Sequence, residues 1–293
     1  IKHCAPPQRP DKVTKTRLSR GKGWALPTRE PRVPDGIDVT IPSVARMYDF
    51  LLGGKDNFAA DREAAAKLLA IVPDAQQVAR NNRDFMVRVI RFLAEAGVSQ
   101  FIDLGTGIPT SPNVHEIARK IVPGARVVYV DHDPVVLAHS RALLATDDGV
   151  IAVKADFRDA GEVLGAPGVI RLIDFSKPVG VLFLSVLHFI GDEENPHGIV
   201  ASFRERLSSG GYLVISAITS ENMQHGVAEG VSDLYRAARS PGVARSREQI
   251  LEFFGGLELE APGLVNVVDW RPDPEASTRP TGVHMLAGVG RKV

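Results

Sequence analysis

The sequence predicts an α/β protein with a doubly wound, mostly parallel β-sheet and helices on both faces. Short apolar runs alternate with amphipathic stretches through most of the chain, which is the pattern of successive βαβ units. Several of these runs are almost entirely apolar, as strands buried on both faces are. The chain has 293 residues, of which 44% are hydrophobic and 24% charged. Such a composition is typical of a globular protein with a sizeable core.

The first 36 residues form a basic, proline-rich tail that we expect to be disordered. They hold nine Lys or Arg, three Asp or Glu and six Pro, so they carry a charge of +6 in a chain whose formal net charge is zero. Residues 1–36 contain too few apolar side chains to offset the entropy lost on ordering. Contact of this tail with nucleic acid or acidic lipid is the less favoured alternative.

Composition also excludes several classes of protein. Cys4 is the single cysteine, so a disulfide scaffold is excluded. No run approaches the roughly 20 apolar residues of a membrane span, and residues 1–10 lack the apolar centre of a secretory signal. We therefore expect a cytoplasmic protein that has neither a membrane nor a nucleic acid as its partner.

Residues 37–97 are expected to form a helical addition ahead of the sheet. A first helix, from about Asp38, has apolar residues at three- and four-residue steps and Pro42 near its first turn, and Gly53-Gly54 ends it. Two further helices are predicted over residues 59–71 and 74–96, the second with Asp74 as its N-cap.

Residues 98–293 are expected to contain the sheet. Five strands are predicted, at residues 100–104, 126–130, 150–155, 179–185 and 212–218. Helices or helical turns are predicted between them, at residues 113–121, 134–145, 159–164 and 194–207. A helix near residues 229–238 follows, and another opens with a capping box from Ser246 to Gln249. Two last strand-like runs, at residues 257–268 and 283–289, are expected to form an antiparallel hairpin at the sheet edge.

The most informative segment is the first predicted strand and the turn after it, which read Phe-Ile-Asp-Leu-Gly-Thr-Gly-Ile-Pro-Thr at 101–110. Gly105 and Gly107 let the backbone turn sharply and approach a ligand closely. Thr110 stands where a dinucleotide fingerprint has its third glycine, which disfavours a pyrophosphate site. The carboxylate of Asp103 is instead placed to receive an ammonium group.

Two more acids end the next two predicted strands. Asp131 follows Gly105 by 26 positions, where a carboxylate can accept both hydroxyls of a ribose. Asp133 precedes a proline and is interpreted as a helix cap. Asp156 ends the third strand, where it could accept from an adenine amino group while Phe157 packs beside the ring. Three acids at successive strand ends predict a nucleoside site.

The chain resembles the class I S-adenosylmethionine-dependent methyltransferases, and more narrowly an actinobacterial family once described as a domain of unknown function. The resemblance covers about residue 38 to the C-terminus. It is carried by Ala-Arg-Met-Tyr-Asp-Phe-Leu-Leu-Gly-Gly-Lys-Asp-Asn-Phe at 45–58, Arg-Asn-Asn-Arg at 80–83, Asp-Leu-Gly-Thr-Gly-Ile-Pro-Thr at 103–110 and Val-Asp-His-Asp-Pro at 130–134. The segment at 53–58 is specific to the family, whereas the strand-end acids identify only the superfamily. The resemblance implies a Rossmann-like, seven-stranded sheet of order 3-2-1-4-5-7-6.

The resemblance also implies S-adenosyl-L-methionine as cofactor and assigns residues to it. Asp103 is expected near the methionine amino group, Gly105 and Gly107 under the cofactor, Asp131 on the ribose, and Asp156 at the adenine. The full expected cofactor site is Asn82, Arg83, Asp103, Gly105, Thr106, Gly107, Thr110, Asp131, His132, Asp156, Phe157 and Ser185. The helices before the sheet are expected to close over this site as a lid.

The candidate catalytic residues are Tyr48, in the lid, and His188, after the fourth strand. An imidazole of ordinary pKa could remove a proton from a hydroxyl or carboxyl group, although a structural role or packing beside the cofactor is favoured for His188. The polar run at residues 55–57 is either an acceptor contact or a polar turn that caps the next helix. No His/Cys cluster has the spacing of a metal site, and no Gly-x-Ser-x-Gly elbow of a hydrolase is present.

The sequence therefore predicts a methyltransferase that acts on a small-molecule acceptor. The Asn/Asp-Pro-Pro-aromatic segment of many enzymes that methylate nucleobase or protein amide nitrogens is missing, which disfavours those acceptors. Displacement at a sulfonium carbon depends mainly on alignment and desolvation, so a base is not required. The alternative is a non-catalytic S-adenosylmethionine-binding regulator, and a dinucleotide-dependent oxidoreductase ranks third. The acceptor and the oligomeric state are not predicted.

Overall fold

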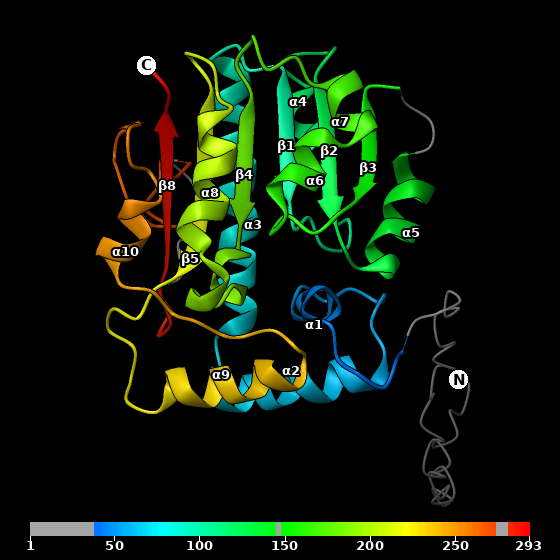
Figure 1. Cartoon of the computed structure of the whole chain (residues 1–293). Coiled ribbons are helices and arrows are strands. Elements are labelled where there is room, and N and C mark those ends of the chain that lie inside the picture. The colour runs from blue at the N-terminus through cyan, green and yellow to red at the C-terminus, as the bar shows by residue number, and fades with distance from the viewer. Residues whose placement is uncertain (1–37, 145–147, 274–280) are drawn as a thin grey trace, which may run out of the picture. The chain divides into compact units, whose positions relative to one another are not determined.

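The computed structural model describes residues 38–144, 148–273 and 281–293, which form a mixed sheet flanked by helices (Figure 1). The sheet has the order β3-β2-β1-β4-β5-β8-β6, and β7 also pairs with β8. The first five strands are parallel, whereas β8 is antiparallel to β5. The strands are β1 (Gln100–Leu104), β2 (Arg126–Asp131), β3 (Val150–Lys154), β4 (Gly180–Leu184), β5 (Tyr212–Ile218), β6 (Glu258–Leu259), β7 (Val265–Asn266) and β8 (Met285–Arg291).

The predicted fold class and strand order are confirmed. The antiparallel strand β8 takes the place of the expected seventh strand, and β6 that of the sixth. The apolar run expected as one strand over residues 257–268 is instead divided into β6 and β7, because a turn at residues 260–263 interrupts it. Both pieces pair with the same strand, so the hairpin lies at the sheet edge as predicted.

The helices of the described residues lie on both faces of the sheet and beyond its carboxyl end. They are α1 (Val44–Leu51), α2 (Ala59–Ile71), α3 (Ala75–Glu95), α4 (Val114–Ala118), α5 (Pro134–Leu144), α6 (Ala160–Gly165), α7 (Pro167–Leu172), α8 (Pro196–Glu205), α9 (Val227–Ala237) and α10 (Arg247–Glu252), with 3-10 turns η1 (Leu187–Phe189) and η2 (Asp192–Glu194). None of the helices in the described part of the chain is long and apolar enough to cross a membrane.

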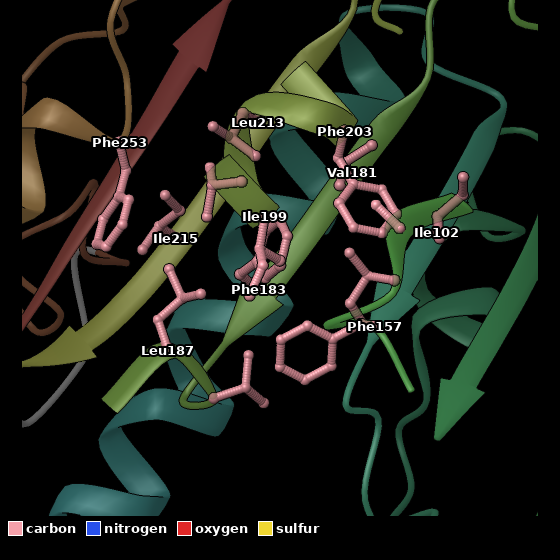
Figure 2. Close-up of a cluster of buried hydrophobic side chains, with 14 of the residues drawn as sticks. Ile102, Phe157, Val181, Phe183, Leu187, Ile199, Phe203, Leu213, Ile215 and Phe253 are labelled. Atoms are coloured by element: carbon pink, nitrogen blue, oxygen red, sulfur yellow. The ribbon is translucent and has the colours of Figure 1, made fainter. Parts of the chain in front are cut away.

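Alternation along the strands divides the core into two layers. Ile102 and Leu104 of β1 pack on the face covered by α6, α7 and α8, whereas Phe101 packs on the face covered by α3 and α4. On the first face, Phe183 meets Phe157 and Phe203 edge to face at ring centroid distances of 5.8 and 5.6 Å (Figure 2). Such pairs add to the burial of the rings themselves.

A third apolar cluster lies among α1, α2, the start of α3 and α9. It includes Met47 and Leu51 of α1, Leu68 of α2 and Tyr235 of α9, all buried. Figure 1 shows α2 and α9 lying alongside each other beyond the carboxyl ends of the parallel strands. The helical addition therefore recruits α9 from a distant part of the sequence. The expected tail, residues 1–36, lies outside the described residues.

Most of the predicted helix boundaries agree within a few residues, and two local details differ. Asp74 stands at the N-cap of α3, but its carboxylate accepts from Gly282 N rather than from the first turn of the helix. The helix α7 was not predicted, because six residues are too few to display a helical period. The capping box of α10 forms as expected, with Ser246 N donating to Gln249 Oε1 at 2.8 Å.

Candidate active site

A cleft of about 490 Å³ opens where β1, β2 and β4 end. The chain continues from β1 to β2 and β3 on one side and then crosses to β4 on the other, and ligands of open α/β sheets bind at such a switch point. Ten of the fourteen predicted site residues line the cleft: Tyr48, Asn82, Arg83, Asp103, Gly105, Thr106, Gly107, Asp131, His132 and Ser185. The other four, Thr110, Asp156, Phe157 and His188, lie around it.

The floor of the cleft is the glycine turn after β1. Gly105 and Gly107 have φ of 67° and 65°, a region that side chains disfavour. A Cβ at Gly105 would lie 2.6 Å from Val186 Cγ1 and 3.3 Å from Phe157 Cε1, whereas one at Gly107 would meet no atom within 4 Å. Gly105 is therefore required by packing as well as by conformation. Phe157 supports this turn from the apolar core below it.

Asp131 braces the same turn from β2. Its Oδ2 accepts from Gly107 N and its Oδ1 from Asp133 N, both at 2.9 Å, and the side chain is buried. Burial raises the pKa of Asp131, and this effect outweighs the two hydrogen bonds, which lower it. Each oxygen of a carboxylate can accept a second hydrogen bond, so Asp131, which lines the cleft, retains two acceptor positions. Asp133 caps α5 as predicted, with Val135 N donating to its Oδ1 at 2.8 Å.

Asp103 is the second buried carboxyl group of the cleft. Thr106 Oγ1 donates to its Oδ2 at 2.7 Å, and this is the hydrogen bond that its side chain makes to the described residues. Burial raises the pKa of Asp103 to about 6, although Thr106 and the positive charge of Arg83 oppose the rise. A cation bound beside this carboxyl group would offset the cost of keeping it ionised in a buried position.

Arg83 holds the loop that follows the glycine turn. Its Nη2 donates to the carbonyl oxygens of Thr110 and Pro112, the latter at 2.7 Å. Thr110 lies in a small polar recess beside the cleft, together with Asp103 and Thr106. His132, the residue after β2, lines the cleft with its side chain 67% exposed.

Asp156 does not line the cleft, and its carboxylate is bound by an arginine. Arg158 Nε lies 2.9 Å from both oxygens of Asp156, and Arg158 Nη1 donates to Glu194 Oε1 at 2.7 Å. Burial raises the pKa of Asp156, but the hydrogen bonds from Arg158 outweigh it and hold this pKa below its ordinary value. Arg158 itself lines the cleft.

A buried chain of hydrogen bonds crosses from the sheet to the helical addition. Ser185 N donates to Ser216 Oγ at 2.9 Å, and Ser216 Oγ donates to Asn82 Oδ1 at 2.6 Å. Asn82 Nδ2 donates to Tyr48 Oη at 3.0 Å, and Tyr48 Oη donates to Ala79 O at 3.1 Å. The chain fixes the tyrosine hydroxyl at the end of the cleft. Ser185 is held at a positive φ of 59°, which is unusual for a residue other than glycine.

A second cavity, which we call the apolar cavity, adjoins this end of the cleft. Tyr48, Ser185 and Phe189 line both spaces. The apolar cavity has a volume of about 90 Å³, several times the roughly 10–15 Å³ that one buried water needs. Aliphatic side chains from α1, α2, α3, α9 and the loop at residues 242–244 form most of its wall. His188 lies in this cavity and not in the cleft.

His188 is buried on η1, and its Nδ1 has no hydrogen-bond partner among the described residues. Burial lowers the pKa of His188 to about 3, and the positive charge of Arg245 contributes. The imidazole is therefore neutral at neutral pH. Arg245, also buried, clamps this segment by donating to Leu187 O at 2.6 Å and Ile190 O at 2.7 Å.

The polar segment at residues 53–58 forms a turn held by internal hydrogen bonds. Asn57 is buried and donates to Asp49 Oδ2 at 2.8 Å and to Gly54 O at 3.1 Å. A Cβ at Gly54 would overlap the carboxylate of Asp49, which would have to move away from its hydrogen bonds to Asp56 N and Asn57 Nδ2. Lys55 and Asp56 do not line the cleft or the apolar cavity. The polar-turn interpretation of this run is thus favoured over an acceptor contact.

Sequence reasoning did not identify several residues of the site. Arg46 lines the cleft and ion-pairs with the buried Asp61 (Nε–Oδ2 2.9 Å). The sequence offered one signal for Arg158, because it follows Asp156 by two positions, a spacing that allows the two side chains to form an ion pair. It offered none for Arg245, whose partners lie more than fifty residues away. Within the described residues, no group of three or more His, Cys, Asp or Glu is placed to hold a metal ion.

The fold and the cleft together define the class of the protein. A sheet whose parallel strands run 3-2-1-4-5, with an antiparallel strand beyond them and a glycine turn after β1, is the Rossmann-like fold of the class I methyltransferases. The model of the S-adenosyl methyltransferase family matches residues 30–293. The chain therefore belongs to this family of enzymes, and its methyl donor is S-adenosyl-L-methionine.

Two solved structures are similar over most of the chain. A presumed methyltransferase from Thermobifida fusca YX shares 41% sequence identity with a TM-score of 0.83, over 88% of this chain and 98% of its own. A DUF574 family protein from Streptomyces avermitilis MA-4680 shares 41% identity with a TM-score of 0.82, over 87% and 99% of the two chains. No curated protein matches the chain.

Proposed function

We propose that the protein transfers the methyl group of S-adenosyl-L-methionine to a small-molecule acceptor held beside the cleft. The observation that carries this proposal is the junction of the two spaces, because Tyr48, Ser185 and Phe189 line both. The cleft has the buried carboxyl groups and the glycine turn that suit a nucleoside with an amino group. The apolar cavity would receive the methyl acceptor.

In this proposal different residues of the cleft bind different parts of the cofactor. Asp103 binds the amino group, because its carboxyl is buried with one donor and faces the cleft. Asp131 binds the ribose hydroxyls with its two remaining acceptor positions. Gly105 and Gly107 allow close approach of the backbone. Asn82, Arg83, Thr106, Thr110, His132 and Ser185 complete the wall or support the loops that form it.

The adenine end is proposed to lie toward β3. Phe157 packs beneath Gly105, and Asp156 holds Arg158 at the edge of the cleft. We therefore assign contact with the base to Arg158, which Asp156 holds in place, rather than to the carboxylate of Asp156 itself.

When bound, the cofactor supplies a methyl group on a sulfonium, which is open to direct displacement by a nucleophile. The contribution of the protein is then alignment and the exclusion of water. Tyr48 is held by Asn82 and Ala79 at the junction, and His188 offers a neutral imidazole in the apolar cavity. We propose that both residues position the acceptor.

The test measures cofactor binding and methyl transfer separately. Calorimetry should give micromolar or tighter binding of S-adenosylhomocysteine and weaker binding of NAD. Tritiated S-adenosylmethionine, incubated with small phenols, alcohols, amines, carboxylates and a cell extract, should label an acceptor. Tight cofactor binding without any transfer would favour the non-catalytic regulator instead. NAD binding as strong as that of S-adenosylhomocysteine would contradict the proposed cofactor site.

A further inference from the structure

The apolar cavity contains no charged lining side chain among the described residues. Its wall is formed by residues such as Leu51, Leu68, Val72, Val231 and Met285. A carboxylate, phosphate or ammonium group placed there would lose its hydration without gaining a partner, which costs several kcal/mol. Arg245, which lies near His188, is engaged by two carbonyl oxygens and by Asp192. The wall therefore selects against charged molecules.

One buried polar atom of the apolar cavity nevertheless has no hydrogen-bond partner among the described residues. It is Nδ1 of His188, whose side chain is buried. Buried polar side chains are nearly always hydrogen-bonded, so an unpaired imidazole nitrogen on an apolar wall points to a missing partner. Because the His188 ring is neutral, it can accept a hydrogen bond from a hydroxyl group.

Both observations concern the space that meets the cofactor cleft at Tyr48, Ser185 and Phe189. Resting on the proposed function, we propose that the methyl acceptor is an uncharged, largely apolar molecule whose hydroxyl group hydrogen-bonds to His188 in the apolar cavity. In this arrangement the apolar wall sets the class of acceptor, and the imidazole sets the orientation of its hydroxyl toward the cleft.

Binding of three matched probes to the full chain tests this proposal. The probes are 2-naphthol, the anion 2-naphthoate and the cation 2-naphthylmethylammonium, titrated calorimetrically with and without saturating S-adenosylhomocysteine. We expect 2-naphthol to bind at least tenfold more tightly than either ion. Ala228→Trp, which fills the apolar cavity from α9, should abolish that binding. Equal or tighter binding of either ion would overturn the proposal.

Variants of His188 test the hydrogen bond. His188→Phe should weaken 2-naphthol binding about tenfold and leave 2-methylnaphthalene binding unchanged, since only the naphthol has a hydroxyl to donate. His188→Gln should restore part of the difference. His197→Phe, an exposed histidine on α8 that stacks on Phe253, is the matched control and should change neither affinity. Unchanged naphthol affinity in His188→Phe would overturn the proposal.

Binding of S-adenosylhomocysteine to each variant separates this inference from the proposed function. A variant that keeps its wild-type cofactor affinity and melting temperature has folded, so its loss of naphthol binding reports on the apolar cavity. Tight cofactor binding with methyl transfer only to carboxylates or amines would overturn the inference while the proposed function stands. Failure to bind S-adenosylhomocysteine would remove the proposed function, whatever the probes do.

Discussion

Replacing Asp103 with Asn should make the ligand-free protein more stable at neutral pH. The carboxyl group is buried, and its pKa is about 6 instead of 3.8. Keeping it ionised in the folded state at pH 7.5 therefore costs up to about 3 kcal/mol. Asn keeps an acceptor for Thr106 Oγ1 but buries an amide that costs about 1 kcal/mol. The expected net gain is roughly 1–2 kcal/mol.

The gain should depend on pH in a defined direction. Between pH 3.8 and 6 the folded protein binds a proton at Asp103 that the unfolded chain does not, so the destabilisation by this group in the wild type decreases as the pH falls through this range. The advantage of Asp103→Asn should accordingly be full above pH 6 and lost near pH 3.8. Urea unfolding from pH 4 to 8 measures the difference. Asp174→Asn is the control, because hydrogen bonds from Ser176 lower the pKa of that exposed carboxyl and no gain is expected.

The same variant also tests the ligand contact proposed for Asp103. An ammonium group bound there would lower its pKa, so binding of S-adenosylhomocysteine near pH 6 should release about half a proton from the wild type. Calorimetry in two buffers of different ionisation enthalpy counts the protons. Asp103→Asn should release none and bind at least tenfold more weakly. A less stable variant at pH 7.5, or equal proton release from both proteins, would refute the reasoning.

Three further changes follow from the cleft and the tail. Gly105→Ala should lower stability and cofactor affinity more than Gly107→Ala, since both share a positive φ but only the first Cβ meets side chains; equal losses by thermal unfolding and calorimetry would contradict the packing argument. Asp131→Asn should weaken S-adenosylhomocysteine about ten- to a hundredfold, with turnover falling in parallel; an unchanged affinity would remove Asp131 from the site. Deleting residues 1–36 should leave the melting temperature and the cofactor affinity nearly unchanged. A loss of several kcal/mol in the free energy of unfolding or of cofactor binding would show that the tail docks on the folded domain.

The sequence predicts the fold well where periodicity is long and local signals bound it. The bounds of α2, β1 and β5 agree with the predicted ranges to the residue. Pairing that depends on distant segments is less accessible, and β6 and β7 illustrate this. Their apolar run looks like one strand, but its two pieces meet β8 separately across a turn.

Part of the candidate site could likewise be predicted from the sequence, and part could not. Asp103 and Asp131 could be found because parallel strands bring their carboxyl ends to one edge of the sheet. The apolar cavity could not, because its wall combines α1, α2, η1 and α9, whose lining residues are up to 187 positions apart in the sequence (Tyr48 to Tyr235). The environment of His188 could not be predicted either. Burial and the charge of Arg245 lower its pKa, and neither can be inferred from the residues next to it in the sequence.

The position of β8 bears on how the protein is made. This strand lies between β5 and β6, yet it comprises residues 285–291 and is synthesised after every other strand of the sheet. Until it is available, β5 presents a free edge of seven residues rich in apolar side chains. Such an edge can pair with other chains. Nascent chains that stop before residue 285 should therefore aggregate or engage chaperones, and the sheet should become protected only when the last strand inserts.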